Sequence, residues 1–105
     1  MENFIRQNSE IDEFVIFGNK HDTFFSEVGD ILRKFNKTLV IIIPSIRKYP
    51  PDIHEASLKD NVLVYEVSTL GMKSTLNKRT QMYVKNVSNS IIIPRKLYDS
   101  ARLRD

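Results

Sequence analysis

The chain has 105 residues, a hydrophobic fraction of 41%, a charged fraction of 28% and a net charge of +3. This is the composition of one small globular domain and not that of a disordered or fibrous chain. Because the chain has no cysteine, disulfide frameworks, thiolate metal sites and cysteine nucleophiles are excluded. Its apolar runs are shorter than the ~20 residues of a membrane-spanning helix, and its N-terminus is too polar for a secretory signal. We therefore expect a cytoplasmic, nucleoid-associated or nuclear protein with no membrane partner.

The first elements are predicted from their hydrophobic periods. Residues 12–18, DEFVIFG, are β-branched and aromatic and end at a glycine, which predicts a strand followed by a turn. In residues 21–36 the apolar side chains recur at helical spacing, at Phe24, Val28, Ile31 and Phe35. We expect Asp22 or Thr23 to cap this helix.

The remaining elements follow in the same way. Residues 37–44, KTLVIIIP, predict a central strand that a proline ends. The segment that begins at Asp52 predicts a helix of about two turns, with Asp52 as its cap. Residues 61–68 and 82–94 are rich in Val, Ile and Tyr and predict two further strands.

This order predicts an α/β (α+β) fold with the succession β-α-β-α-β-β. Right-handed crossovers would place both helices on one face of a mixed four-stranded sheet, and the last two strands would form an antiparallel hairpin. Residues 69–83 would then project as a basic hairpin arm. We expect a single domain over residues 1–105, with an N-terminal extension at 1–11, a folded core at 12–96 and a basic tail at 97–105.

The positive charge is concentrated in the C-terminal part. Residues 1–65 carry eight Lys and Arg against ten Asp and Glu, whereas residues 66–105 carry eight against three, so the two parts have net charges of −2 and +5. Such asymmetry is typical of proteins with an acidic partner, most often a phosphate backbone. A solvated basic face on a domain that binds nothing is the simpler alternative.

Two stretches resemble the Alba superfamily of small nucleic-acid-binding proteins. EFVIFGNKHDTFFSEVGDILRKFNKTLVIII is similar to its first half, with Gly18, Asn19 and Lys20 at the place of the family's glycine and basic pair. RTQMYVKNVSNSIIIPRK is similar to its closing strand. The region between departs from the pattern, because PSIRKYPPDIHEASL has no glycine and a shortened helix.

The resemblance implies a homodimer that grips duplex DNA or structured RNA with its body and two hairpin arms. It implies that nucleic acid is bound by Lys20, Arg47, Lys48, Lys73, Lys78 and Arg79. We expect Asn19, which replaces one lysine of the family's pair, and Lys85 to contact it as well. A second resemblance is to the AbrB-like swapped-hairpin DNA-binding modules, and it is carried by NSIIIPRKLYDSARLRD and by LVIIIPSIRKY followed by SLKDNVLVYEV. That similarity implies a transcriptional regulator, and hence the same kind of partner.

The basic arm leads to the same expectation on physical grounds. Cations on an arm can follow a phosphate track, which gives salt-sensitive binding with little sequence preference. Alternatively, the arm is a solvated loop whose charges protect a sheet edge from aggregation. A further alternative is a non-catalytic homodimeric interaction module, since Phe24, Phe25 and Phe35 form a strongly aromatic stripe.

Signals for catalysis or cofactor binding are weak. His21 and His54 are 33 positions apart and have no carboxylate at ligand spacing, so we expect no metal site. The sequence has no nucleophile elbow, phosphate loop or dinucleotide fingerprint. We therefore expect neither an enzyme nor a cofactor or small-molecule substrate. A small hydrolase that uses Asp22, Glu27 and Asp30 is the alternative, although their spacing is that of a solvated helix face.

Overall fold

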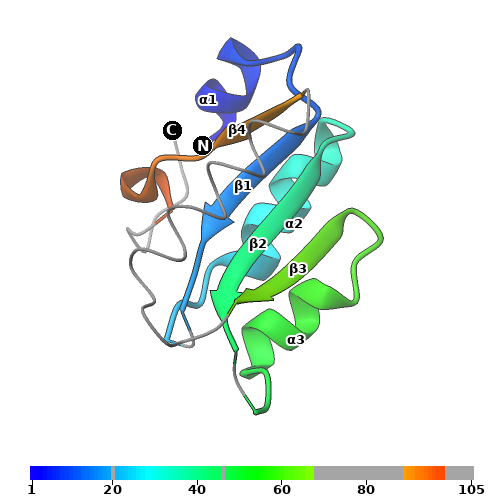
Figure 1. Cartoon of the computed structure of the whole chain (residues 1–105). Coiled ribbons are helices and arrows are strands. Elements are labelled where there is room, and N and C mark those ends of the chain that lie inside the picture. Colours follow the sequence, from blue (N-terminus) through cyan, green and yellow to red (C-terminus); the bar gives the residue numbers. More distant parts are fainter. Residues whose placement is uncertain (20, 46, 68–88, 99–105) are drawn as a thin grey trace.

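The computed structural model describes residues 1–19, 21–45, 47–67 and 89–98 (Figure 1). Three α-helices, four strands and one 3₁₀ turn follow one another in these ranges. In chain order they are α1 (Glu2–Gln7), β1 (Glu13–Phe17), α2 (Phe25–Lys34), β2 (Thr38–Pro44), α3 (Pro51–Ser57), β3 (Val62–Val67), β4 (Ser90–Ile92) and η1 (Arg95–Leu97).

The four strands form one sheet in the order β3-β2-β1-β4. All three pairings are parallel, with Val15 of β1 opposite Val40 of β2 and opposite Ile92 of β4. The predicted α+β class, with helices and a four-stranded sheet, is confirmed. The predicted mixed sheet is wrong for the described strands.

The predicted hairpin between the last two strands is also wrong, because β3 and β4 lie at opposite edges of the sheet. The reason lies in β1, where Phe14, Val15 and Ile16 are fully buried. A strand buried on both faces needs a partner on each side for its backbone groups. β2 supplies one side of β1, and β4 supplies the other. The predicted arm at 69–83 lies outside the described residues.

Alternate residues of the strands belong to separate clusters on the two faces of the sheet. From β1, Phe14 and Ile16 join the larger cluster, whereas Val15 joins a smaller one with Val40 and Ile42. This alternation is the two-residue period of a strand. It explains why the central strands read as unbroken apolar runs in the sequence, since both of their faces are buried.

The described helices pack on a single face. Each contributes side chains to the larger cluster, among them Ile5 from α1, Leu32 from α2 and Ile53 from α3. Helix α1 lies within the segment that the sequence assigned to an N-terminal extension. Its Phe4 ring meets Phe14 of β1 edge to face, with 6.1 Å between ring centroids, so this segment packs on the core.

A tight C-terminal cap ends α2 and directs the chain into β2. Asn36 has a φ of 59°, a left-handed conformation that asparagine tolerates better than most residues. The backbone N–H of Asn36 donates to the Arg33 carbonyl, and that of Lys37 donates to the Leu32 carbonyl. These two bonds satisfy carbonyls at the end of the helix, so β2 can begin at Thr38 without a longer loop.

Gly18 is the point where β1 turns toward α2, and the space around it is closed. A Cβ atom at this position would lie 2.1 Å from the Cζ atom of Phe25, whose ring is fully buried. The backbone of Gly18 is also fixed, because its N–H donates to the Ile42 carbonyl at 2.9 Å. Close approach of a core ring therefore requires glycine here.

We predict that Gly18→Ala lowers the free energy of unfolding by about 2 kcal/mol, as overpacking of a rigid core does. Urea unfolding would measure the loss. The control is the same substitution in a Phe25→Leu background, where the smaller side chain leaves room for the methyl group. Gly18→Ala should cost clearly less in that background, and equal costs in the two backgrounds would contradict the steric explanation.

Candidate functional site

The carboxyl ends of the four parallel strands lie together at one end of the sheet. We call this end the carboxyl edge, as distinct from the outer strands β3 and β4. Its described residues come from the loops after β1 and β2 and from the segment after β4 (Figure 1). The chain leaves β1 toward β2, whereas β4 lies on the opposite side of β1. In open parallel sheets, ligands bind at the carboxyl edge where the strand order reverses in this way. The carboxyl edge is therefore the candidate site.

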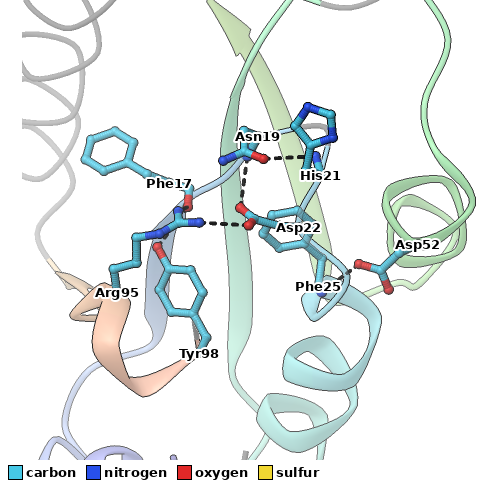
Figure 2. A network of polar contacts seen from close by, with 8 residues as sticks. All are labelled: Phe17, Asn19, His21, Asp22, Phe25, Asp52, Arg95 and Tyr98. Atoms are coloured by element: carbon cyan, nitrogen blue, oxygen red, sulfur yellow. Dashed lines mark hydrogen bonds and ion pairs between the residues drawn. The ribbon is translucent and has the colours of Figure 1, made fainter. Parts of the chain in front are cut away.

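The loop after β1 is folded by its own polar groups (Figure 2). The Oδ1 atom of Asn19 accepts the His21 backbone N–H at 2.9 Å. The Oδ2 atom of Asp22 accepts the Asn19 N–H at 3.0 Å, and the Asp22 N–H donates back to the Asn19 carbonyl. The Asn19 side-chain oxygen thus shapes the loop, as asparagine often does in turns.

Asp22 is also the partner of an arginine from the far end of the chain. Its Oδ1 atom lies 2.7 Å from Nη2 of Arg95. The Phe17 carbonyl accepts hydrogen bonds from Arg95 Nη1 at 3.2 Å and from the Tyr98 hydroxyl at 2.8 Å. Together, Phe17, Asp22, Arg95 and Tyr98 hold the segment after β4 against the end of β1 (Figure 2). We call these four residues the β1–β4 anchor.

The anchor changes the acidity of Tyr98, which is 1% exposed. Burial raises the pKa of its hydroxyl above 10.0, and the positive charge of Arg95 opposes part of this rise. A buried phenolate is poorly solvated, so the neutral hydroxyl is the form that the fold accommodates. At neutral pH this hydroxyl is therefore protonated and can donate its hydrogen bond to Phe17.

The N-terminus of α2 is occupied by a carboxylate of the chain itself. Asp52, in the first turn of α3, accepts the backbone N–H groups of Phe25 at 2.8 Å and Ser26 at 3.2 Å. The predicted caps Asp22 and Thr23 do not serve here, since the N-cap residue is Phe24 and makes no side-chain cap bond. Asp52 likewise makes no cap bond to its own helix. The free N–H groups at the start of α2 attract an anion, and the Asp52 carboxylate fills this role. Asp52 therefore ties α3 to α2.

The loop after β2 carries exposed cations beside a hollow. Arg47 and Lys48 are exposed, and Tyr49 packs against the core with its hydroxyl hydrogen-bonded to Glu66 at the end of β3. Burial raises the pKa of the Tyr49 hydroxyl, and the Glu66 charge raises it further. The hollow, which we call the Tyr49 hollow, has a volume of about 840 Å³ and is lined by Arg47, Lys48, Tyr49, Pro50, Pro51, His54 and Glu66.

Near the opposite ends of the strands, most of the described cations are paired. Arg33, Lys37 and Lys59 each lie within 4 Å of a carboxylate, from Asp60, Asp12 and Asp30 respectively, whereas the exposed Lys34 has no such partner in the described ranges. At the carboxyl edge, Arg47, Lys48 and Lys96 are exposed and have no ion-pair partner within residues 1–19, 21–45, 47–67 and 89–98. These cations are therefore open to an external anion on the described surface.

Three of the predicted binding residues are described, and the fold brings them to one edge. Asn19 lies in the loop after β1, and Arg47 and Lys48 lie in the loop after the neighbouring strand β2. The Asn19 side-chain oxygen accepts a hydrogen bond within its own loop, whereas the side chains of Arg47 and Lys48 are exposed to solvent. The other predicted residues lie outside the described ranges: Lys20, Lys73, Lys78, Arg79 and Lys85.

Sequence reasoning missed the β1–β4 anchor. Arg95 and Tyr98 fell near the start of the basic tail predicted at 97–105. Asp22 was interpreted as a cap, as part of a solvated helix face or as one of three carboxylates of a hydrolase. The pairing joins residues 73 positions apart, and no local pattern indicates it. The one available signal was the step from an apolar run into Pro94, Arg95 and Lys96, which places an arginine directly after a strand.

The described residues contain no group of three or more His, Asp or Glu side chains that could hold a metal ion. Among the helices in the described part of the chain, none has the length and hydropathy needed to cross a membrane. Comparison of the chain with protein-family models, with curated proteins and with solved structures found no match.

We predict that Asp52→Ala lowers the free energy of unfolding by about 1–2 kcal/mol, the cost of losing an N-cap. Urea unfolding followed by circular dichroism would measure it. Glu55→Ala is the matched control, because Glu55 is an exposed carboxylate on the same helix. Equal losses in the two variants would contradict the assigned role of Asp52.

Tyr98→Phe should cost about 1 kcal/mol at neutral pH, since it removes the hydrogen bond to Phe17. Because the folded-state pKa of Tyr98 is raised, this group stabilises the fold below its unfolded-state pKa of 10.0, and the contribution is lost as the pH rises through the folded-state value. The stability difference between the wild type and Tyr98→Phe should therefore be constant below about pH 9 and shrink as the pH rises above about 10. Urea unfolding of both proteins across this range tests it, and a constant difference would contradict it.

Proposed function

We propose that this chain is a non-catalytic nucleic-acid-binding protein whose carboxyl edge contacts phosphate groups. The observation that supports the proposal most is the pair Arg47 and Lys48, exposed and without an ion-pair partner in the described ranges. Lys96 follows β4, two strands away, and parallel strands lie about 4.8 Å apart. Cations from the loop after β2 and from the segment after β4 therefore lie together at the carboxyl edge.

The carboxyl edge is better suited to contact phosphate groups than to read the hydrogen-bonding groups of bases. Lysine and arginine side chains that contact phosphates release condensed counterions, which gives affinity with little dependence on sequence. In this proposal Lys20, Lys73, Lys78, Arg79 and Lys85, which lie outside the described residues, add further phosphate contacts, and a homodimer doubles their number. The partner is DNA or RNA, and neither a cofactor nor a reaction is needed.

A second candidate function is a protein-interaction module, and the exposed apolar surface of β3 favours it. Leu63 is 44% exposed and Tyr65 is 47% exposed, although β3 is part of the sheet. β3 is also the edge strand beside β2 in the described sheet. Edge strands with apolar side chains are common places for pairing with another chain.

We predict that Arg47→Ala combined with Lys48→Ala weakens binding to a mixed-sequence oligonucleotide and reduces the slope of log affinity against log salt by about 1.5–2. Fluorescence anisotropy between low and physiological salt, with DNA and RNA probes, measures both quantities. The matched control is Arg33→Ala combined with Lys34→Ala, which removes the same charge from the C-terminal end of α2.

The control variant should retain most of the wild-type slope, because its cations lie at the other edge of the sheet. An equal loss in both variants would indicate an effect of net charge alone and would contradict a site at the carboxyl edge. If the wild type binds neither DNA nor RNA at low salt, the nucleic-acid proposal fails. A dimer detected by light scattering would then favour the interaction module.

A further inference from the structure

The Tyr49 hollow combines two kinds of surface. Its lining is largely apolar and includes the Tyr49, Pro50 and Pro51 side chains, which we call its floor. The charged side chains of Arg47, Lys48 and Glu66 also line it, and Glu66 is engaged by the Tyr49 hydroxyl. Its volume of about 840 Å³ is within the range of roughly 300–1,000 Å³ that small-molecule sites occupy. Its volume and lining therefore suit a ligand of moderate size that combines a flat apolar part with an anionic group.

The floor of the hollow is held in place by the fold. The Tyr49 ring packs against the core, and its hydroxyl is bonded to Glu66. His54 adds a second aromatic ring from the exposed side of α3. Aromatic rings fixed in this way serve as platforms for bases, because every base presents a π-face, whereas phosphates are attracted to the cations beside them.

We propose that the Tyr49 hollow binds one unpaired nucleotide of a single-stranded nucleic acid, with the base against Tyr49 and its phosphate near Arg47 and Lys48. This inference rests on the proposed function and specifies its ligand. In a duplex the bases are stacked on one another and the phosphates lie outside, so the apolar floor would remain unused. A single strand can turn a base out of its stack and fill both parts of the hollow.

The test uses the full chain and three oligonucleotides of equal length: an ordinary single strand, a strand that is abasic at every position, and a duplex. Fluorescence anisotropy at a series of salt concentrations gives the three affinities and their salt dependence. At each salt concentration the ordinary strand should bind about tenfold more tightly than the abasic strand, which has the same charge but no base to stack. The comparison requires no substitution in the protein.

Tyr49→Leu should lower affinity for the ordinary strand by about tenfold, the effect of losing one stacked base, and should leave affinity for the abasic strand unchanged. Leucine is chosen because it keeps the apolar contact with the core. The matched control is Tyr65→Leu, because Tyr65 is exposed and does not line the hollow. Equal, salt-sensitive binding of the ordinary and abasic strands by the wild type would overturn the inference and leave the proposed function standing. Failure to bind any of the three at low salt would overturn both.

Discussion

The parallel pairing of β1 with β2 on one side and with β4 on the other is the constraint on which this structure depends. It satisfies the backbone groups of β1 on both edges, while the two side-chain clusters bury its two faces. Because β4 is only three residues long, its pairing needs support from side chains. Arg95 and Tyr98 provide that support by donating to the Phe17 carbonyl, at the point where the ladder ends.

Side chains at the carboxyl edge divide into those that hold the fold together and those that remain free for a ligand. Arg95 is engaged with Asp22 and Phe17, and Asp52 fills the start of α2. Many doubly wound sheets bind phosphate at the N-terminus of the helix that follows the first strand, which is α2 in this chain. In this chain a carboxylate of the protein occupies it, so the proposed contacts to phosphate come from the side chains of Arg47 and Lys48.

Local patterns were sufficient to predict β1, α2, β2, α3 and β3, with differences of a few residues at their ends. Each of these elements shows a recognisable apolar pattern. The buried strands are unbroken apolar runs, and α2 has Val28, Ile31 and Leu32 on one face. Helix α1 was missed because its six residues are too few to show a helical period. That Arg47 and Lys48 bind nucleic acid stays a prediction, and the structure shows both side chains exposed in the loop after β2.

The sequence by itself therefore determined which segments are strands and helices and that a four-stranded sheet forms, because these depend on periodicity and on the conformational preferences of nearby residues. Only the tertiary structure decided that Ser90–Ile92 pairs with β1 and lies at the opposite edge from β3. It also decided that Asp52 caps α2, and that Asp22 meets Arg95. These contacts join residues 26 to 77 positions apart, and their partners are set by which groups the packed sheet brings within reach, whereas periodicity and local preferences reflect only nearby residues.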